Sequence, residues 1–340
     1  MEDLIKRNRF SKDNVKTVLM DKAISIVLLV LIIVIAIINP KILSFRVLRD
    51  ILMQSSTKII IALGMMLVIL IGGVDLGASR LVGMAAVVSA SMLQTPDYVR
   101  RFYPEMGQLP IIVPILIAVL IGAFWGVLNG VVVAKFQVPA FIATLGSMLI
   151  IYGVNSIYFN MPPNNSQPIG GLRSDFTALG SSSIGPIPVI VIFAIVAIII
   201  MWVLLNKTVF GKNIYAVGGN KEAAMVSGIN ITAIIIGLFV VCDSLIAVGG
   251  VLEAARTGGA TNNYGVGYEL DAIASCVVGG VSVTGGVGKV SGVITGVLIF
   301  TFINYGLTFI GVNPYWQNII KGLIIVSAVA FDIQKYVQKK

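Results

Sequence analysis

The sequence predicts an all-α membrane protein: a transmembrane bundle of about ten helices that span the bilayer or re-enter it. Hydrophobic residues make up 57% of the 340 residues, whereas charged residues make up only 11%. The mean hydropathy is +0.98. Several apolar stretches approach the length of about 20 residues that a helix needs to cross the hydrocarbon core. Helices also satisfy their own backbone hydrogen bonds, which lipid cannot do.

Glycine, proline and charged residues divide the apolar stretches into the candidate helices. In chain order these are residues 24–38, 51–72, 79–94, 111–134, 138–159, 187–205, 231–253, 269–283, 290–311 and 316–332. The eighth is short and ends in glycine, so we leave open whether it spans the membrane or re-enters it. The first follows basic residues as a signal peptide does, but no small-residue cleavage site follows it, so we expect it to be retained.

Residues 24–332 thus form the transmembrane domain, between a basic N-terminus (1–23) and a C-terminal tail (333–340). An even number of crossings places both ends on one side. The net charge is +9, from 24 Lys and Arg against 15 Asp and Glu. Most basic residues fall on the side of the N-terminus, and cytoplasmic loops carry such an excess. We therefore expect both termini to be cytoplasmic and infer no nucleic-acid partner from the charge.

The same topology places residues 206–230 in the cytoplasm, and the polar loops Thr95–Pro110 and Asn160–Pro186 on the opposite side. Eight basic residues fall on that opposite side, and four of them lie in one segment. These four are Lys41, Arg46, Arg49 and Lys58. We interpret this segment as an amphipathic helix along the membrane interface.

Glycine recurs every four residues in two predicted helices. The positions are Gly122, Gly126 and Gly130 in one, and Gly288, Gly292 and Gly296 in the other. Such spacing lets a neighbouring helix approach closely. GVLNGVVV resembles GVITGVLI, and IGGVDLGAS resembles VGGVSVTGG at a different offset. The similarities suggest an internal repeat, which many transporters contain, but the two offsets cannot define the same repeat.

The sequence contains few of the residues and motifs that enzymes use for catalysis. Histidine, the commonest general base and metal ligand, is absent. We interpret Cys242 and Cys276 as small buried apolar side chains rather than a disulfide or metal site. GGVGKVSG (285–292) lacks the first Gly and the Ser or Thr that a phosphate-binding loop needs. We therefore expect no catalytic residue, no metal and no nucleotide on this chain.

A polar stretch, GKNIYAVGGNKEAAMVSGIN (211–230), separates two long apolar runs. Lys221–Ser227 favours a short helix that Gly228 ends. Taken alone, this is a solvated loop helix. However, Glu222, Ala223 and Ala224, followed by Gly228, resemble the EAA-x-x-x-G coupling loop of ATP-binding-cassette (ABC) importer permeases. On that resemblance we assign an ATPase-coupling role to Gly211, Gly218, Gly219, Asn220, Glu222, Ala223, Ala224 and Gly228.

Three other stretches carry the resemblance across most of the chain. GGVDLGASRLVG (72–83) resembles the G-G-x-D-L-S motif of ribose-type sugar permeases, with Gly77 where Ser is usual. GATNNYGVGYELDAIASCVVGGVSVTGG (259–286) is similar to the same family. FINYGLTFIGVNPYWQNIIKG (302–322) is similar in detail to its galactose/methyl-galactoside branch.

The resemblance implies a non-enzymatic permease subunit of an ABC importer in the bacterial inner membrane. Galactose or a methyl galactoside is the first expectation for its cargo, and ribose or another monosaccharide the second. The implied partners are a second copy of the chain, a periplasmic or extracellular sugar-binding protein, membrane lipid, and a cytoplasmic ATPase that binds ATP and Mg²⁺.

Polar residues inside or near apolar segments are candidates for the substrate path, because burying them is costly. They are Asp75, Asn129, Glu253, Asn262, Asn263, Tyr264 and Asp271. Each has a structural alternative: Asp75 and Asp271 as helix caps, Asn129 as a partner of a neighbouring backbone, and the others as solvated loop residues. Asp243 lies inside an apolar segment where the family resemblance leads us to expect a small uncharged residue. We expect its carboxyl to be paired or protonated.

A second function class uses the same carboxylates. In an ion-coupled secondary transporter, Asp75, Asp243 or Asp271 would couple sugar to protons or sodium. The segment that resembles a coupling loop would then have no purpose. A membrane enzyme is a more distant third, because nucleophiles and bases are so few.

Overall fold

The computed structural model describes residues 28–337. The predicted basic N-terminus (1–23) and residues 338–340 of the C-terminal tail lie outside the described residues. Within this range, seven helices are long and apolar enough to cross a membrane. They are α3 (Phe45–Leu70), α5 (Ile112–Lys135), α6 (Ala140–Asn160), α8 (Val189–Lys207), α11 (Ile231–Thr257), α13 (Val290–Phe309) and α14 (Pro314–Val337). The prediction of a polytopic all-α bundle is confirmed.

Within residues 28–337, seven of the ten predicted segments correspond to helices long enough to span the membrane, so the prediction of about ten spanning or re-entrant helices is only approximate in number. Leu28–Ile38 and α4 (Ala78–Met92) are apolar but shorter than the other candidates. The predicted segment 269–283 contains α12 (Tyr268–Val278), which has 11 residues. A helix of this length rises about 16 Å, roughly half of the hydrocarbon thickness. The chain then turns at Gly279 and Gly280, so this segment is not a spanning helix.

The remaining elements are short. They are the 3-10 helix η2 (Pro40–Leu43), α7 (Ser174–Ser181), α9 (Val209–Gly219), α10 (Lys221–Val226), and a hairpin of β1 (Ser183–Ile184) and β2 (Ile187–Pro188). The hairpin strands are antiparallel, with Ser183 opposite Pro188.

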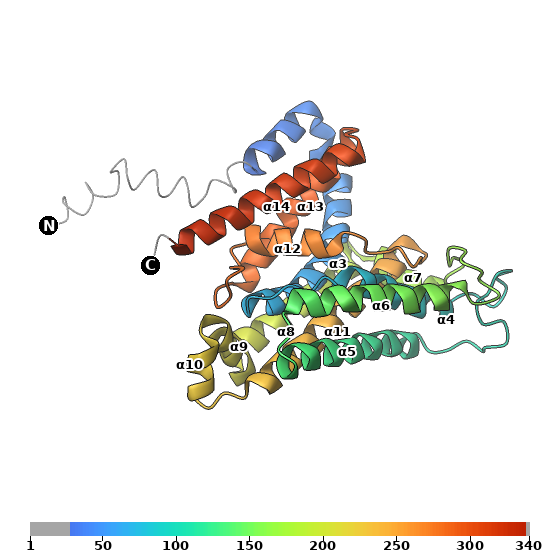
Figure 1. The fold of residues 1–340 in the computed structure, drawn as a ribbon. Coiled ribbons are helices and arrows are strands. Elements are labelled where there is room, and N and C mark those ends of the chain that lie inside the picture. The colour runs from blue at the N-terminus through green and yellow to red at the C-terminus, as the bar shows by residue number, and fades with distance from the viewer. Residues whose placement is uncertain (1–27, 338–340) are drawn as a thin grey trace.

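Helix α3 forms the centre of the bundle. In its most apolar stretch 78% of the residues are buried, compared with 11% in α14. Helix α11 packs most extensively against α5, α4 and α3, as Figure 1 shows. The second predicted helix begins earlier than expected, because α3 starts at Phe45 rather than at residue 51. Arg46, Arg49 and Lys58 therefore belong to this helix, and not to a separate interfacial helix.

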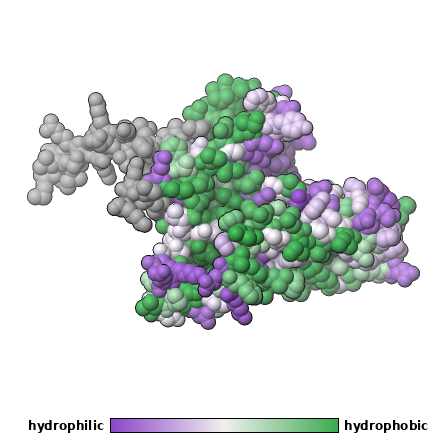
Figure 2. Space-filling view, in the orientation of Figure 1, coloured by the Kyte–Doolittle hydropathy of each residue, from purple (hydrophilic) through white to green (hydrophobic). Residues whose placement is uncertain are grey.

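The two ends of the bundle are more hydrophilic than its middle. Figure 2 shows hydrophobic residues across much of the visible face, with hydrophilic residues gathered around α9 and α10 and at the opposite end. At that opposite end, β-bridges join Gln94 to Leu172 and Ile169 to Ala260. The predicted polar loop 160–186 thus meets both Gln94, which precedes the other polar loop, and Ala260, away from α9 and α10.

The glycine-lined faces pack closely on other helices. A methyl group at Gly122, Gly126 or Gly130 of α5 would lie 2.5–2.7 Å from backbone atoms of α11. On α13, the equivalent methyl groups at Gly292 and Gly296 would lie 2.0 Å from carbonyl oxygens of the α12 region. Gly288 differs from the prediction, because it precedes α13 and faces the Val281 side chain from a loop.

Candidate coupling site and buried polar clusters

The segment 206–230 contains two helices, α9 and α10, of which the sequence predicted only the second. Asn220 separates them: it is extended, and its side-chain oxygen accepts a 2.8 Å hydrogen bond from the N–H of Ala223 at the start of α10. Gly228 follows α10 with φ +83°, a conformation that favours glycine. The side chain of Asn230 then caps α11 by accepting from the N–H of Ala233 at 3.0 Å.

One face of α10 points away from the protein. Glu222, Ala223, Met225 and Val226 are exposed, whereas Ala224 is buried against the chain itself. Val226 is 89% exposed. The two alanines of the motif therefore differ in role: Ala224 anchors α10 and Ala223 belongs to its free surface. An exposed Met–Val pair next to a carboxylate is an unusual surface for a helix that contacts only water.

Helix α9 packs on the ends of the central helices. A methyl group at Gly218 would lie 1.8 Å from the carbonyl oxygen of Leu70, the last residue of α3. The same oxygen accepts a 2.8 Å hydrogen bond from the N–H of Gly286. The phenol of Tyr215 donates to the carbonyl oxygen of Gly288 at 2.9 Å. The end of α3 and the loop before α13 are thereby joined to α9.

Not all glycines assigned to ATPase coupling contact the central helices as Gly218 does. A methyl group at Gly211 would lie 2.3 Å from the Leu204 carbonyl oxygen, so this glycine permits the tight turn from α8 into α9. At Gly219 a methyl group would meet nothing within 4 Å. A cavity of about 220 Å³ lies beside α10, lined by Lys221 of α10, Val217 of α9, Gly72, Gly73 and residues 137–140 among others.

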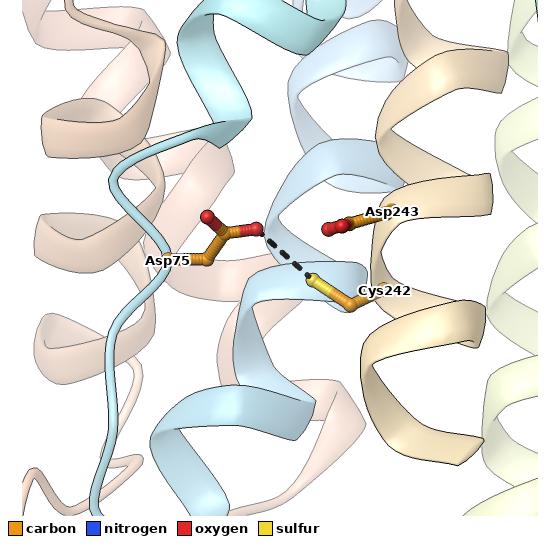
Figure 3. A group of neighbouring side chains, drawn as sticks. All are labelled: Asp75, Cys242 and Asp243. Atoms are coloured by element: carbon orange, nitrogen blue, oxygen red, sulfur yellow. Dashed lines mark hydrogen bonds between the residues drawn. The ribbon is translucent and has the colours of Figure 1, made fainter. Parts of the chain in front are cut away.

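The predicted path residues fall into three separate places. The first is a buried cluster around Asp243, which faces Asp75 in Figure 3 and is also contacted by Asn129. The Asn129 side-chain amide donates to Asp243 Oδ2 at 3.2 Å. Asp75 Oδ1 accepts from the N–H of Gly77 at 2.8 Å, just before α4. The capping interpretation of Asp75 thus accounts for one of its oxygens, and Asp243 has a partner that the sequence did not identify.

The second place is a network of ion pairs around α12. Asp271 pairs with Lys58 at 3.0 Å and with Lys321 at 3.1 Å. Glu253 pairs with Arg256 at 2.6 Å. The two pairs of Asp271 join α12 to α3 and α14 and stabilise the bundle, whereas the pair of Glu253 lies within α11.

Further hydrogen bonds complete the surroundings of Glu253. Its carboxylate accepts from the hydroxyl of Tyr268 at 2.9 Å and of Thr57 at 3.0 Å. The Tyr268 ring also lies beneath the Lys58 ammonium group. Glu253 and Asp271 are therefore engaged within the protein.

The third place is the loop between α11 and α12, which holds Asn262, Asn263 and Tyr264. Asn262 donates to the Ser156 hydroxyl at 3.0 Å, and Tyr264 donates to that of Thr257 at 3.1 Å. The Asn263 side chain is exposed, at 3.4 Å from the Arg80 guanidinium. This loop lies at the end of the bundle opposite to α10.

Sequence reasoning missed Lys58, Lys321, Cys242 and Tyr215. Lys321 offered a signal, because a lysine inside an apolar helix needs a partner. Tyr215 offered none.

The chain was compared with known proteins. Residues 47–329 match a family model described as "Branched-chain amino acid transport system / permease component". The chain is 51% identical to the galactose/methyl galactoside import permease protein MglC of Haemophilus influenzae, over 95% of this chain and 96% of that protein. It is 51% identical to MglC of Escherichia coli, over 97% of this chain and 99% of that protein.

It is 38% identical to the ribose import permease protein RbsC of Escherichia coli, over 94% of this chain and 96% of that protein. No solved structure matches the chain. Seven apolar helices and the near-complete family match lead to one conclusion: the chain is a multi-pass membrane protein that belongs to the family of branched-chain amino acid transport system permease components.

Proposed function

We propose that the chain is the membrane-spanning subunit of an ABC importer that carries galactose or a methyl galactoside into the cell. The observation that carries this proposal is 51% identity, over nearly the whole chain, to permeases named for these sugars. The identity to the ribose permease is lower, 38%, so ribose is the second choice. The chain would work as a homodimer with a sugar-binding protein outside and an ATPase inside.

The exposed face of α10 supports an ATPase as the partner. Met225 and Val226 offer apolar contacts, and Glu222 lies beside them at the first turn. An ATPase groove that received this face would bury it, which explains why an otherwise polar segment exposes it. ATP would drive the transporter by binding one arrangement of the ATPases, and hence of the two permeases, more tightly than the other.

Helix α9 is the proposed connection between this surface and the bundle. A displacement of α10 is passed to Gly218, which touches the backbone at Leu70. The same turn continues into residues 71–77, which contain Asp75 and lead into α4. The cavity beside α10 leaves room for that displacement.

A neutral sugar is bound through hydroxyl groups, so its path needs no uncompensated charge. We accordingly withdraw Glu253 and Asp271 from the path and assign them to the ion-pair network. Asn262, Asn263 and Tyr264 remain candidates, either for the entry of the path or for contact with the sugar-binding protein.

The test uses two chemically identical substitutions. Val226→Glu places a charge on the proposed docking face, and Val99→Glu places one in a loop at the other end, where Val99 is 98% exposed. We expect Val226→Glu to lower co-purification of the ATPase and ATP-driven galactose uptake about tenfold or more, as for a central interface residue. Val99→Glu should leave both unchanged.

Uptake measured in proteoliposomes also distinguishes this proposal from the alternative of an ion-coupled secondary transporter. If the chain without an ATPase accumulates galactose in response to a proton or sodium gradient, the chain is a secondary transporter and the proposal is wrong. Equal uptake by both glutamate variants would also contradict docking at α10.

A further inference from the structure

Three side chains from two parts of the chain converge in the core of the bundle (Figure 3). Asp75 comes from the connection between α3 and α4, and Cys242 and Asp243 are neighbours on α11. All three are buried. One ligand atom from each, two carboxylate oxygens and the thiol sulfur, lie within 4.8 Å of one another.

Each carboxylate has one oxygen held by the protein and one that faces the cluster. Asp75 Oδ1 accepts from the N–H of Gly77, and Oδ2 accepts from the thiol of Cys242 at 4.0 Å. Asp243 Oδ2 accepts from Asn129, whose own oxygen accepts from Ser147. Asp243 Oδ1 is buried without a hydrogen-bond partner. Hydrogen-bonded carboxylates of this kind are typical of metal ligands, which need fixed orientations.

The cluster needs positive charge. Within residues 28–337, neither Asp75 nor Asp243 takes part in an ion pair. Two adjacent carboxylates cannot both stay ionised in an apolar core without a cation. A shared proton would neutralise only one of the two charges. A divalent cation would neutralise both carboxylates.

The donor set matches zinc-type cations, which combine cysteine sulfur with carboxylate oxygen. Bond lengths of about 2.3 Å to sulfur and 2.0 Å to oxygen place these atoms about 3.5 Å apart across a tetrahedral ion. The 4.0 Å separation between Cys242 and Asp75 is close to this value.

We propose that Asp75, Cys242 and Asp243 form a buried site for one divalent, thiophilic cation of the zinc type. This departs from the expectation that the chain holds no metal and that Cys242 is only a small apolar residue. Binding forms the metal–sulfur bond and releases the thiol proton to solvent. A thiolate and two carboxylates around the cation then leave one net negative charge on the site, compared with two for the ionised carboxylates alone. The cation ties α11 to the connection that leads into α4, and therefore stabilises the bundle without taking part in sugar recognition.

Cobalt is the probe, because a cobalt–thiolate bond produces a charge-transfer absorption band, and zinc then competes with it. The full chain, purified in detergent and stripped with a chelator, is titrated with Co²⁺. We expect a saturable band equivalent to one cation per chain, lost on addition of Zn²⁺. Cys242→Ser should abolish the band, and Asp243→Asn should weaken it at least tenfold. Cys276→Ser is the matched control, because Cys276 is also buried but donates to the Ala62 carbonyl oxygen.

A second measurement, the thermal unfolding midpoint, does not depend on the cobalt absorption band. Zn²⁺ should raise the thermal unfolding midpoint of the unsubstituted chain and of Cys276→Ser, but not of Cys242→Ser, because only a folded site binds it. If Asp243→Asn does not fold, Asp75→Asn replaces it. Absence of the band in the unsubstituted chain, or an equal band in Cys242→Ser, overturns the proposal and leaves a shared proton as the neutralising cation. Neither readout involves transport, so failure here is distinct from failure of the proposed function.

Discussion

The phenol of Tyr215 donates a hydrogen bond of 2.9 Å to the carbonyl oxygen of Gly288 and thereby joins α9 to the loop that precedes α13. That loop is held from a second side, because Asp332 of α14 accepts from the N–H of Val283 at 3.0 Å. Helix α9 therefore contacts a loop that is itself fixed to the bundle. A helix can transmit a displacement of α10 to the bundle only if it contacts a part of the bundle that is itself held in place.

Tyr215→Phe tests the hydrogen bond between α9 and the loop before α13. Burial raises the pKa of the Tyr215 phenol above its ordinary value, so the hydroxyl remains a donor throughout the neutral range. Its removal should lower the free energy of unfolding by about 1 kcal/mol, the usual net value of one hydrogen bond. We expect a larger relative loss in ATP-driven uptake than in thermal stability in detergent.

Tyr315→Phe is the control for that experiment, because Tyr315 is exposed at the start of α14. It should change neither quantity. An equal loss of uptake in both variants would show that the Tyr215 hydroxyl has no special role.

Gly218→Ala tests the backbone contact between α9 and the end of α3. The added methyl group would lie 1.8 Å from the Leu70 carbonyl oxygen, so α9 must move. Overpacking of this kind costs about 1–3 kcal/mol. Gly219→Ala is the control in the same helix, since its methyl group meets nothing within 4 Å. We expect a lower unfolding midpoint only for Gly218→Ala; equal midpoints for the two variants would contradict the observed packing.

The positions of the long helices follow from hydropathy, because an apolar stretch of sufficient length has few other stable arrangements. Helix α9 was missed for a local reason: Gly211, Gly218 and Gly219 are typical of turns, yet two of them permit close backbone contacts within or beside a helix. The short helix α10 was predicted because Lys221–Ser227 is rich in residues that favour a helix and Gly228 is a strong stop signal.

The buried clusters could not be predicted, because their members are distant in the sequence. Asp75 meets Asp243, and Asp271 meets Lys58 and Lys321, only after α3, α11, α12 and α14 have packed together. Sequence patterns showed that each carboxylate needed compensation but not where it would come from. Asp271, for example, was predicted to line the substrate path, and the structure shows in addition that it lies between two lysines.

Asp271→Asn tests the ion-pair network. The substitution removes the charge that compensates both Lys58 and Lys321, while it keeps the shape of the side chain. Because the Asp271 side chain is only 9% exposed, we expect a loss of about 2 kcal/mol, between the values for exposed and buried pairs. Asp175→Asn is the control: Asp175 pairs with Arg173, but its side chain is 42% exposed. That variant should lose less than about 1 kcal/mol.

The unfolding midpoints of Asp271→Asn and Asp175→Asn, measured in the same detergent, test whether the loss of stability is larger for Asp271→Asn. Lys321→Met combined with Asp271→Asn should recover part of the lost stability, because one uncompensated ammonium group is removed. If the double variant is less stable than Asp271→Asn alone, the carboxylate of Asp271 does not compensate Lys321.

Gly122→Ala tests the contact between α5 and α11 beside the buried carboxylates. The added methyl group would lie 2.5 Å from the carbonyl oxygen of Asp243 and 2.7 Å from the Ala247 side chain, so α5 and α11 must separate. We expect a cost of about 1–3 kcal/mol. Asn129 lies on the same helix, two turns further along, and donates to Asp243. Separation of the helices should therefore weaken cobalt binding at Asp243 as well as stability.

Gly146→Ala on α6 is the matched control, because a methyl group there meets nothing within 4 Å. It should leave the unfolding midpoint and cobalt affinity unchanged. A Gly122→Ala protein that unfolds earlier but binds cobalt normally would show that the packing of α5 does not set the position of Asp243. Normal values for both quantities would show that α5 and α11 are further apart than the structure places them.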